Sequence, residues 1–270
     1  MGWFEAVLLG LIQGLTEFLP ISSSAHVLIV SQIFGWEDPG AAFTAVIQIG
    51  TEAAVIVYFR RDLARILRAW SHSLRTRVLT TESKLGWYII IGTLPIVILG
   101  VTFTRQIETA ARNLWLVASV LIAFGVVLGL ADRYGAKMRS LSSMSSRDGV
   151  ILGFGQALAL IPGVSRSGAT ITTGLALGYT REAAARYSFL LAIPAVLGAG
   201  FYEASKIGTD SSVAWGPTLA ATAISFVVGY AVIAWLLRYI STHSFLPFVI
   251  YRIALGAGVL TLLSLGILSS

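Results

Sequence analysis

The sequence predicts an all-α polytopic membrane protein, built as an inverted repeat of two halves, each a re-entrant helical hairpin plus three transmembrane helices. Of its 270 residues, 56% are hydrophobic and only 12% are charged, well below the ~25% charged residues of an ordinary soluble domain. Apolar segments recur along the whole chain, and two of them are interrupted by Pro, Gly and Ser. Basic residues gather in two loops between apolar segments, as the positive-inside rule requires of a membrane protein.

The first half begins with two short apolar segments, Trp3 to Leu19 and Val27 to Trp36, separated by Pro20 and three serines. Each is shorter than the ~20 apolar residues of a membrane crossing, so they predict a re-entrant hairpin. Phe43 to Phe59 then predicts a crossing. The next stretch, Arg60 to Lys84, carries seven basic residues against two acidic ones, so we expect a cytoplasmic loop there.

Two more crossings, Gly86 to Phe103 and Leu114 to Ala131, are expected to be joined outside by the turn Arg105 to Arg112. A polar loop, Asp132 to Asp148, then returns to the cytoplasm and marks the midpoint. The second half repeats the plan. Its elements are the broken pair Val150 to Tyr179 and the crossings Tyr187 to Tyr202, Leu219 to Leu237 and Phe245 to Leu268.

An internal repeat is visible when Leu9 to Ala25 is set against Leu152 to Gly168 at an offset of 143, because six of the seventeen positions are then identical. We expect one membrane domain, 1–270, with repeat 1 at about 1–135 and repeat 2 at about 148–270. An odd number of crossings per half inverts the second copy, so the two hairpin tips would meet near the midplane, where such repeats usually build a polar site.

The second tip reads Pro162 to Thr170 and contains one arginine, Arg166, between two apolar segments. A buried arginine needs a partner. Glycines let a backbone approach a ligand, hydroxyls donate to it, and a helix N-terminus favours an anion, so this tip predicts a phosphate cradle. An Arg that merely pairs with one carboxylate is the alternative. The residues assigned to phosphate binding here are Ser165, Ser167, Gly168 and Thr170, beside Arg166.

Symmetry places the first tip opposite Arg166. Its candidates are Gln13, Glu17, Ser22, Ser23, Ser24 and His26. Acidic groups beside a phosphate indicate a divalent cation, Mg²⁺ or Ca²⁺, which takes one or two carboxylates plus phosphate oxygens. We expect Glu17 at the metal, unless it only pairs with an arginine. Ser23 as a nucleophile needs a base, for which His26 is the candidate, unless that histidine only bonds between helices.

Two further charges lie within apolar segments, Glu52 and Arg252. We expect Glu52 to be either a second metal carboxylate or an ion-pair partner, and Arg252 to be either a phosphate ligand or a structural charge. The net charge of +6 is explained by the loops and comes without a nucleic-acid-binding motif. The chain has no cysteine, so thiol chemistry is excluded, and its start lacks the basic residues of a signal peptide, so we expect that segment to be retained.

Two stretches resemble the signatures of the undecaprenyl-diphosphate phosphatase family, the bacitracin-resistance membrane phosphatases. Gln13 to Pro20, followed by Ser22-Ser23 and His26, is similar to the first, and Pro162 to Thr170 matches the second at every fixed position. The resemblance covers essentially the whole chain. It implies a metal-dependent enzyme of the bacterial plasma membrane that removes the terminal phosphate of undecaprenyl diphosphate, regenerating the lipid carrier of cell-wall synthesis. It also favours a site open to the outer leaflet.

By position, the resemblance implies that Glu17 serves the metal, Arg166 clamps the diphosphate with the hydroxyls of its tip, and Ser23 and His26 lie closest to the chemistry. Many members have Glu where this chain has Gln13. Our hypothesis is that Glu52 supplies the missing acidic group. The expected partners are a polyprenyl diphosphate and membrane lipids, with no nucleic acid, and a homo-oligomer is compatible with the sequence.

Three other classes compete with this interpretation. A transporter or lipid flippase also fits inverted repeats with midplane charges, but explains less well why hydroxyls, histidine and arginine converge on two tips. A membrane phosphatase with two histidines fits poorly, since His72 and His243 lie outside the predicted core. A purely structural protein would not need five buried charges.

Overall fold

A computed structural model describes residues 2–37, 40–111, 113–207 and 214–268, which form helices and loops; within these ranges the only β-type pairing is an isolated bridge between Arg139 and Tyr179. In chain order the helices are α1 (Trp3–Thr16), α2 (Ser23–Ile33), α3 (Gly40–Tyr58), α4 (Arg60–Thr76), α5 (Thr81–Thr102), α6 (Thr104–Ala111), α7 (Leu114–Tyr134), α8 (Ser146–Ala157), α9 (Arg166–Ala176), α10 (Arg181–Ile207), α11 (Trp215–Ile240) and α12 (Leu246–Ser264), with short 3₁₀ turns at Leu141–Ser143 and Leu158–Leu160.

Five of these helices, α5, α7, α10, α11 and α12, are long and apolar enough to cross a membrane, and α3 with α4 passes the same test as a pair bent by 77°. Side chains on the outside of α5 are apolar and exposed, with Val101 77% and Ile98 60% exposed, as expected of a surface that contacts lipid rather than water. The predicted all-α polytopic membrane protein is therefore confirmed at this level.

One predicted loop is a helix. The basic stretch Arg60 to Lys84 contains the whole of α4, because its apolar residues recur at helical spacing and pack against α5. A Cβ on Gly86 of α5 would lie 3.2 Å from Trp70 and 3.3 Å from Ile66, both on α4. Residues 105–111 of the predicted turn Arg105 to Arg112 likewise belong to α6, which begins at Thr104, and Arg112 lies outside the described residues.

Four short helices carry the interrupted segments, and each first helix packs on a long one: α1 on α11 and α8 on α5. Both pairs approach closely at a glycine. A Cβ on Gly10 would lie 2.5 Å from the carbonyl oxygen of Ala221, and one on Gly153 would lie 2.5 Å from that of Gly92. Larger residues there would push apart the helices that carry the two tips.

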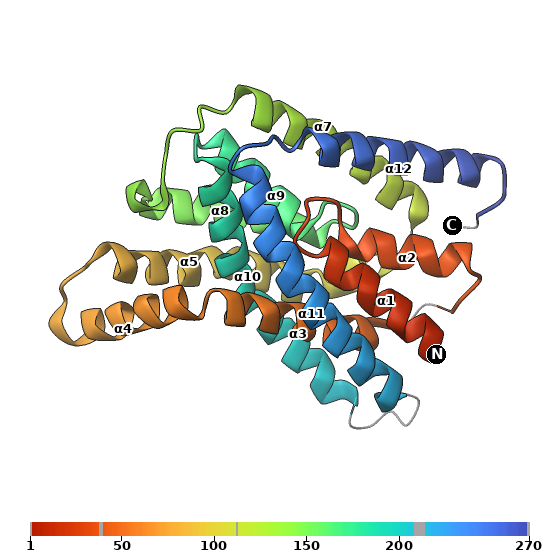
Figure 1. Ribbon diagram of the computed structural model, residues 1–270, viewed down its shortest axis with the longest axis horizontal. Coiled ribbons are helices and arrows are strands. Elements are labelled where there is room, and N and C mark those ends of the chain that lie inside the picture. The colour runs from red at the N-terminus through yellow and green to blue at the C-terminus, as the bar shows by residue number, and fades with distance from the viewer. Residues whose placement is uncertain (1, 38–39, 112, 208–213, 269–270) are drawn as a thin grey trace.

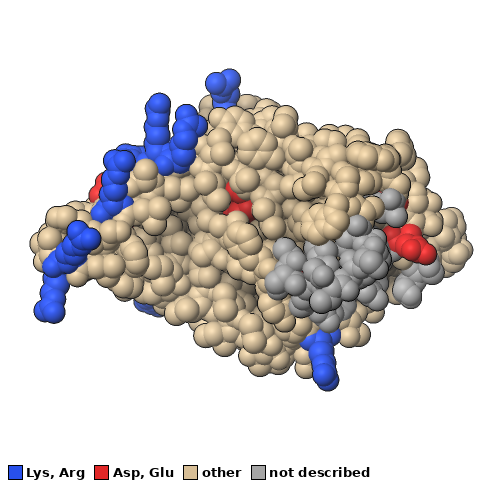
Figure 2. Space-filling model, turned by 90° about the horizontal axis from the view of Figure 1, so that it is seen from below, with Lys and Arg blue, Asp and Glu red and all other residues tan. Residues whose placement is uncertain are grey.

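The molecule has one markedly basic end. Helices α4 and α5 lie side by side and extend together from the body of the molecule (Figure 1). Most of the Lys and Arg side chains visible in Figure 2 gather over that same end, whereas the rest of the visible surface is largely uncharged. The interrupted segments lie away from this end, between the long helices (Figure 1).

Candidate active site

The two interrupted segments meet tip to tip. In both, a serine with left-handed backbone precedes the second helix: Ser22 has φ 72° before α2, and Ser165 has φ 73° before α9. This conformation is strained for a residue with a Cβ and persists only where the surroundings hold it. The Ser167 hydroxyl, in the first turn of α9, donates to the carbonyl of Leu19 at 3.0 Å and so ties the second tip to the first.

Arg252 of α12 clamps both tips. Its Nη1 donates to the carbonyls of Pro20 and Val164, both at 3.0 Å, its Nη2 to that of Gly163 at 2.9 Å, and its Nε to that of Leu121 at 3.2 Å. The side chain is completely buried. Of the two expected roles, these partners are those of a structural charge, because the guanidinium is already shared by four backbone carbonyls.

Glu17 lies at the centre of the polar contacts between the tips. Its Oε1 accepts from Arg166 Nη2 at 2.7 Å, and its Oε2 accepts from Ser23 Oγ at 2.6 Å and Gln13 Nε2 at 2.7 Å. The carboxylate of Glu52, completely buried on α3, lies 3.6 Å from the same Arg166 Nη2. The structure thus brings together the acidic, basic and hydroxyl groups that the two motifs predicted.

The charges at this point are unbalanced. Two buried carboxylates, Glu17 and Glu52, share one guanidinium. Three buried oxygens have no hydrogen-bond donor among the described residues: both carboxylate oxygens of Glu52 and Oε1 of Gln13. Unpaired buried oxygens are costly, so the arrangement calls for a further positive or hydrogen-bonding group.

The contacts of His26 fix its tautomer. Its Nδ1 lies 2.7 Å from the carbonyl oxygen of Ser22, which can only accept, so Nδ1 carries the proton in the neutral ring. Its Nε2 then accepts from the hydroxyl of Tyr251 at 2.8 Å, and the planes of the two rings are 7° apart. The base expected for Ser23 is therefore directed elsewhere, and Ser23 donates to Glu17 instead.

Tyr251 was missed by sequence reasoning. An exposed tyrosine in an apolar helix is usually a membrane-interface anchor, and only its position beside Arg252 could have singled it out. The side chains of this dipeptide serve the two tips together, Tyr251 at His26 and Arg252 at the backbone carbonyls.

The other predicted phosphate ligands have local partners. Ser165 Oγ caps α9 by accepting from the N–H of Gly168, and Thr170 Oγ1 donates to the carbonyl of Arg166 within the helix. Ser22 and Ser24 lie 3.3 Å apart through their hydroxyls, and Ser24 is exposed. The cap of α2 has no side-chain bond, so its first N–H groups are available to an anion, whereas in α9 the N–H of Gly168 already donates to Ser165.

A second buried acid lies at the start of α8, away from the tips. Asp148 accepts from Arg139 Nη2 at 2.6 Å, from Ser145 Oγ at 2.7 Å and from the Tyr179 hydroxyl at 2.9 Å. Burial raises the pKa of this carboxyl, but these hydrogen bonds outweigh it and hold the pKa below its ordinary range. The same network raises the pKa of Tyr179, through burial first and then its bond to the carboxylate.

The fold and this geometry define an integral membrane protein with a buried site of acids, arginine and hydroxyls between two interrupted helices. Residues 6–258 match the family model described as Bacitracin resistance protein BacA, and the chain belongs to this family. It is 56% identical to the undecaprenyl-diphosphatase of a Nocardioides species, with 99% of each chain covered. It is 57% identical to undecaprenyl-diphosphatase 2 of Frankia casuarinae, over all of this chain and 97% of the relative. It is also 57% identical to undecaprenyl-diphosphatase 2 of Agrobacterium fabrum, over all of this chain and 99% of the relative.

Proposed function

We propose that this protein hydrolyses undecaprenyl diphosphate to undecaprenyl phosphate and inorganic phosphate, recycling the lipid carrier of the bacterial cell wall. The observation that carries the proposal is that both motifs converge on Glu17, which accepts from Ser23 of the first tip and from Arg166 of the second. The ion pair alone is also what the structural alternative expected, but a simple pair does not explain the second carboxylate, Glu52, whose oxygens have no donor among the described residues. Sequence identity of 56% and 57%, over nearly the full length, to proteins named undecaprenyl-diphosphatases supports the proposal. The enzyme is a hydrolase acting on a diphosphate anhydride.

The diphosphate would be held by positive charge and by N–H and O–H donors. Phosphoryl transfer depends mainly on positioning and on neutralising the transferred group. Arg166, whose side chain is 14% exposed, can turn from Glu17 toward a phosphate oxygen. The uncapped start of α2 offers backbone N–H groups beside the hydroxyls of Ser23 and Ser24.

We assign the attack to Ser23 or to a water in its place. Glu17 Oε2, 2.6 Å from Ser23 Oγ, accepts the proton of the attacking oxygen. The new bond forms at the terminal phosphorus, and the P–O bond of the anhydride breaks, so that the electron pair leaves on the lipid monophosphate. If Ser23 attacks, water then releases phosphate from the serine, and Glu17 returns its proton to Ser23 Oγ as that bond breaks. Nε2 of His26 can take the proton of this water once the Tyr251 hydroxyl, now 2.8 Å away, has turned from it.

The residues fit a divalent cation. In the described part of the chain, no group of three or more His, Asp or Glu could hold a metal alone, but Glu52 and Gln13 offer unpaired buried oxygens beside Glu17. Mg²⁺ or Ca²⁺ is commonly bound by one or two carboxylates together with substrate phosphates. Such an ion would neutralise the negative charge of the phosphate. Glu52 would supply the carboxylate that is absent at Gln13, and we expect the ion to bind only together with the substrate.

We also propose that the two halves form an inverted repeat, with the site opening to the outer leaflet. Helices α2 and α9 have equal lengths of 11 residues and begin 143 positions apart (166 minus 23). The same offset relates Ser22 to Ser165, with equal left-handed conformations, and Gly10 to Gly153, with equal helix contacts. Accessibility of a cysteine introduced at Ser24 to a membrane-impermeant thiol reagent in intact cells tests the leaflet.

The test of the function is phosphate release from undecaprenyl diphosphate by the purified protein, with and without a chelator. The protein should release phosphate, and chelation should stop it until Mg²⁺ or Ca²⁺ is restored. Arg166→Gln should reduce the rate at least ~100-fold, the order of loss seen when one preorganised charge-stabilising donor is removed. A protein that translocates the lipid without releasing phosphate would instead establish the transporter.

A further inference from the structure

The hydroxyl of Tyr251 occupies the nitrogen that would serve as a base in the candidate active site. His26 Nδ1 is bonded to the carbonyl of Ser22 at 2.7 Å, so Nε2 carries the lone pair, and Tyr251 donates to it at 2.8 Å. The two rings are stacked, with their centroids 5.5 Å apart. While Nε2 accepts this hydrogen bond, it cannot take a proton from a water molecule. One of the two rings must therefore move before His26 can act as a base.

The two side chains are held to different degrees. His26 is 8% exposed and is fixed by the bond from its Nδ1 to the backbone of the first tip. Tyr251 is 44% exposed, so its phenol has room to turn about the Cα–Cβ bond. The backbone of α12 stays in place during such a turn, because the neighbouring Arg252 is bonded to four carbonyls. The ring that can move is therefore the phenol of Tyr251.

The proposed function fixes where a diphosphate would lie between the tips. The terminal phosphate has to reach Ser23 Oγ, which is bonded to Glu17. Ser23 and His26 are three positions apart on α2, so they lie on one face of the helix with their Cβ atoms ~5–6 Å apart. Exposure increases from Glu17, at 7%, through His26 to Tyr251, so this direction leads out of the site. The phosphate that carries the lipid would therefore lie on the Tyr251 side.

We propose that Tyr251 is a catalytic residue whose hydroxyl turns from His26 Nε2 to an oxygen of the lipid-bearing phosphate when the substrate binds. This assignment rests on the proposed function. A phosphate oxygen is the stronger acceptor, because hydrogen bonds to an ionised group are roughly twice as strong as those between neutral groups. Substrate binding therefore supplies the free energy that releases Nε2 of His26.

The turn of the phenol has two chemical consequences. While the lipid phosphate remains bound, Nε2 of His26 is free to take the proton of the water that releases phosphate. The phenol itself donates to the phosphate on which the electron pair of the broken P–O bond is left, and a donor placed there stabilises the charge that develops in the transition state. Tyr251 donates a hydrogen bond and keeps its proton, so the proton transfers among Ser23, Glu17 and water are unchanged.

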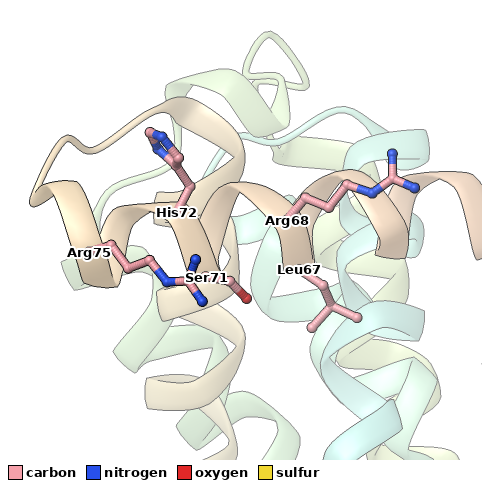
Figure 3. A pocket seen from close by; sticks show the side chains of 5 residues that line it. All are labelled: Leu67, Arg68, Ser71, His72 and Arg75. Atoms are coloured by element: carbon pink, nitrogen blue, oxygen red, sulfur yellow. The ribbon is translucent and has the colours of Figure 1, made fainter.

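The turn is tested by ¹⁵N NMR of the full-length protein, labelled at histidine, in detergent at pH ~8.5, where a histidine of ordinary pKa ~6.5 is neutral. The chain has three histidines. His72, in a shallow pocket on α4 (Figure 3), and His243, which follows α11, are both exposed. Replacing both by Asn leaves His26 as the single source of the signals. The matched control variant is Tyr230→Phe, which removes a phenol hydroxyl from a 38% exposed residue of α11.

We expect the Nε2 signal of Tyr251→Phe to lie downfield of the wild-type signal, because accepting a hydrogen bond moves the signal of an imidazole nitrogen upfield. Saturating undecaprenyl phosphate should move the wild-type signal to the position seen in Tyr251→Phe, whereas inorganic phosphate should leave it in place. Tyr230→Phe should behave as the wild type does. Equal signals in the wild type and Tyr251→Phe, or a wild-type signal that stays in place with undecaprenyl phosphate, would overturn the inference. So would an equal movement with inorganic phosphate.

Kinetic measurements separate this inference from the proposed function. The NMR signals do not require hydrolysis, so a wild type that releases no phosphate would refute the function by a different measurement. In the active protein, Tyr251→Phe should lower kcat by ~5- to 10-fold, the equivalent of one hydrogen bond. KM should stay within about 2-fold, because the lost bond is strongest in the transition state. Tyr230→Phe should keep both constants. A raised KM at unchanged kcat in Tyr251→Phe would contradict a contact with the leaving phosphate.

Discussion

Replacing Arg252 by Met tests whether one buried guanidinium holds the two hairpin tips together. Four carbonyls accept from this side chain, at 2.9 to 3.2 Å. Hydrogen bonds to a charged group contribute ~1.5–3 kcal/mol each, and part of their sum is offset by the cost of burying the charge, which is several kcal/mol. Removing the guanidinium leaves the carbonyls unpaired, so we expect a net loss of about 3–5 kcal/mol.

The assay is thermal unfolding in mild detergent, combined with phosphate release at a temperature where the variant remains folded. A loss of this size lowers the Tm by on the order of 10 °C for a chain of this length. Activity should fall at least ~10-fold, because a small displacement of the tips separates Glu17 from Arg166. Arg252→Lys keeps the charge but has one donor nitrogen for four dispersed carbonyls, so its Tm should lie between those of the wild type and Arg252→Met. An unchanged Tm in Arg252→Met, with activity abolished, would refute the claim that Arg252 holds the two tips together and would favour its alternative role as a phosphate ligand.

Three further predictions concern single side chains. Tyr251→Phe removes the donor to His26 Nε2, so kcat/KM should fall by roughly 5- to 10-fold, the equivalent of one hydrogen bond. The Tm should stay unchanged because Tyr251 is 44% exposed. Glu52→Gln should raise the concentration of divalent cation needed for half-maximal phosphate release by at least ~10-fold, since one carboxylate is lost. Asp148→Asn should be less stable than the wild type above pH ~5, and the difference in Tm should shrink as the pH falls from ~5 to ~3.

The sign of the last prediction follows from the depressed pKa of Asp148. Its stabilisation is complete above the ordinary carboxyl pKa of ~3.9 and is lost as the pH falls toward the lower pKa of the folded state. A Tm difference independent of pH would contradict it. A Tyr251→Phe variant with full activity would mean that His26 needs no partner at Nε2. Full activity and unchanged metal dependence in Glu52→Gln would end the idea that Glu52 replaces the acid absent at Gln13.

Much of the fold could be predicted because lipid imposes long apolar segments. Composition and the interrupted segments predicted the helices but not all of their bounds, since the segment predicted to begin at Val27 belongs to α2, which begins at Ser23. The prediction of a loop at Arg60 to Lys84 was wrong because charge count outweighed helical periodicity. Ile66 and Trp70, four positions apart, carry that periodicity. A mean hydropathy over the whole stretch hides it, because the many charged residues of the stretch dominate the mean.

Which side chains meet between the two tips was predictable from the sequence, but which of them bond to one another was less so. Charges buried in apolar segments must meet a partner, which is why Glu17 and Arg166 could be identified from the sequence. The partner of each donor is set by tertiary geometry that spacing does not encode. Ser23 lies near His26 in sequence yet donates to Glu17, while His26 is held by Tyr251, 225 positions away.

A double-mutant cycle between Glu17 and Arg166 tests most directly whether the two tips form one phosphatase site. The measurement is kcat/KM for phosphate release from undecaprenyl diphosphate by the wild type, Glu17→Gln, Arg166→Gln and the double variant. Groups that act as a unit are strongly non-additive, so the double variant should be little worse than the poorer single variant. Losses that simply multiply, or phosphate release that survives both substitutions, would contradict the account.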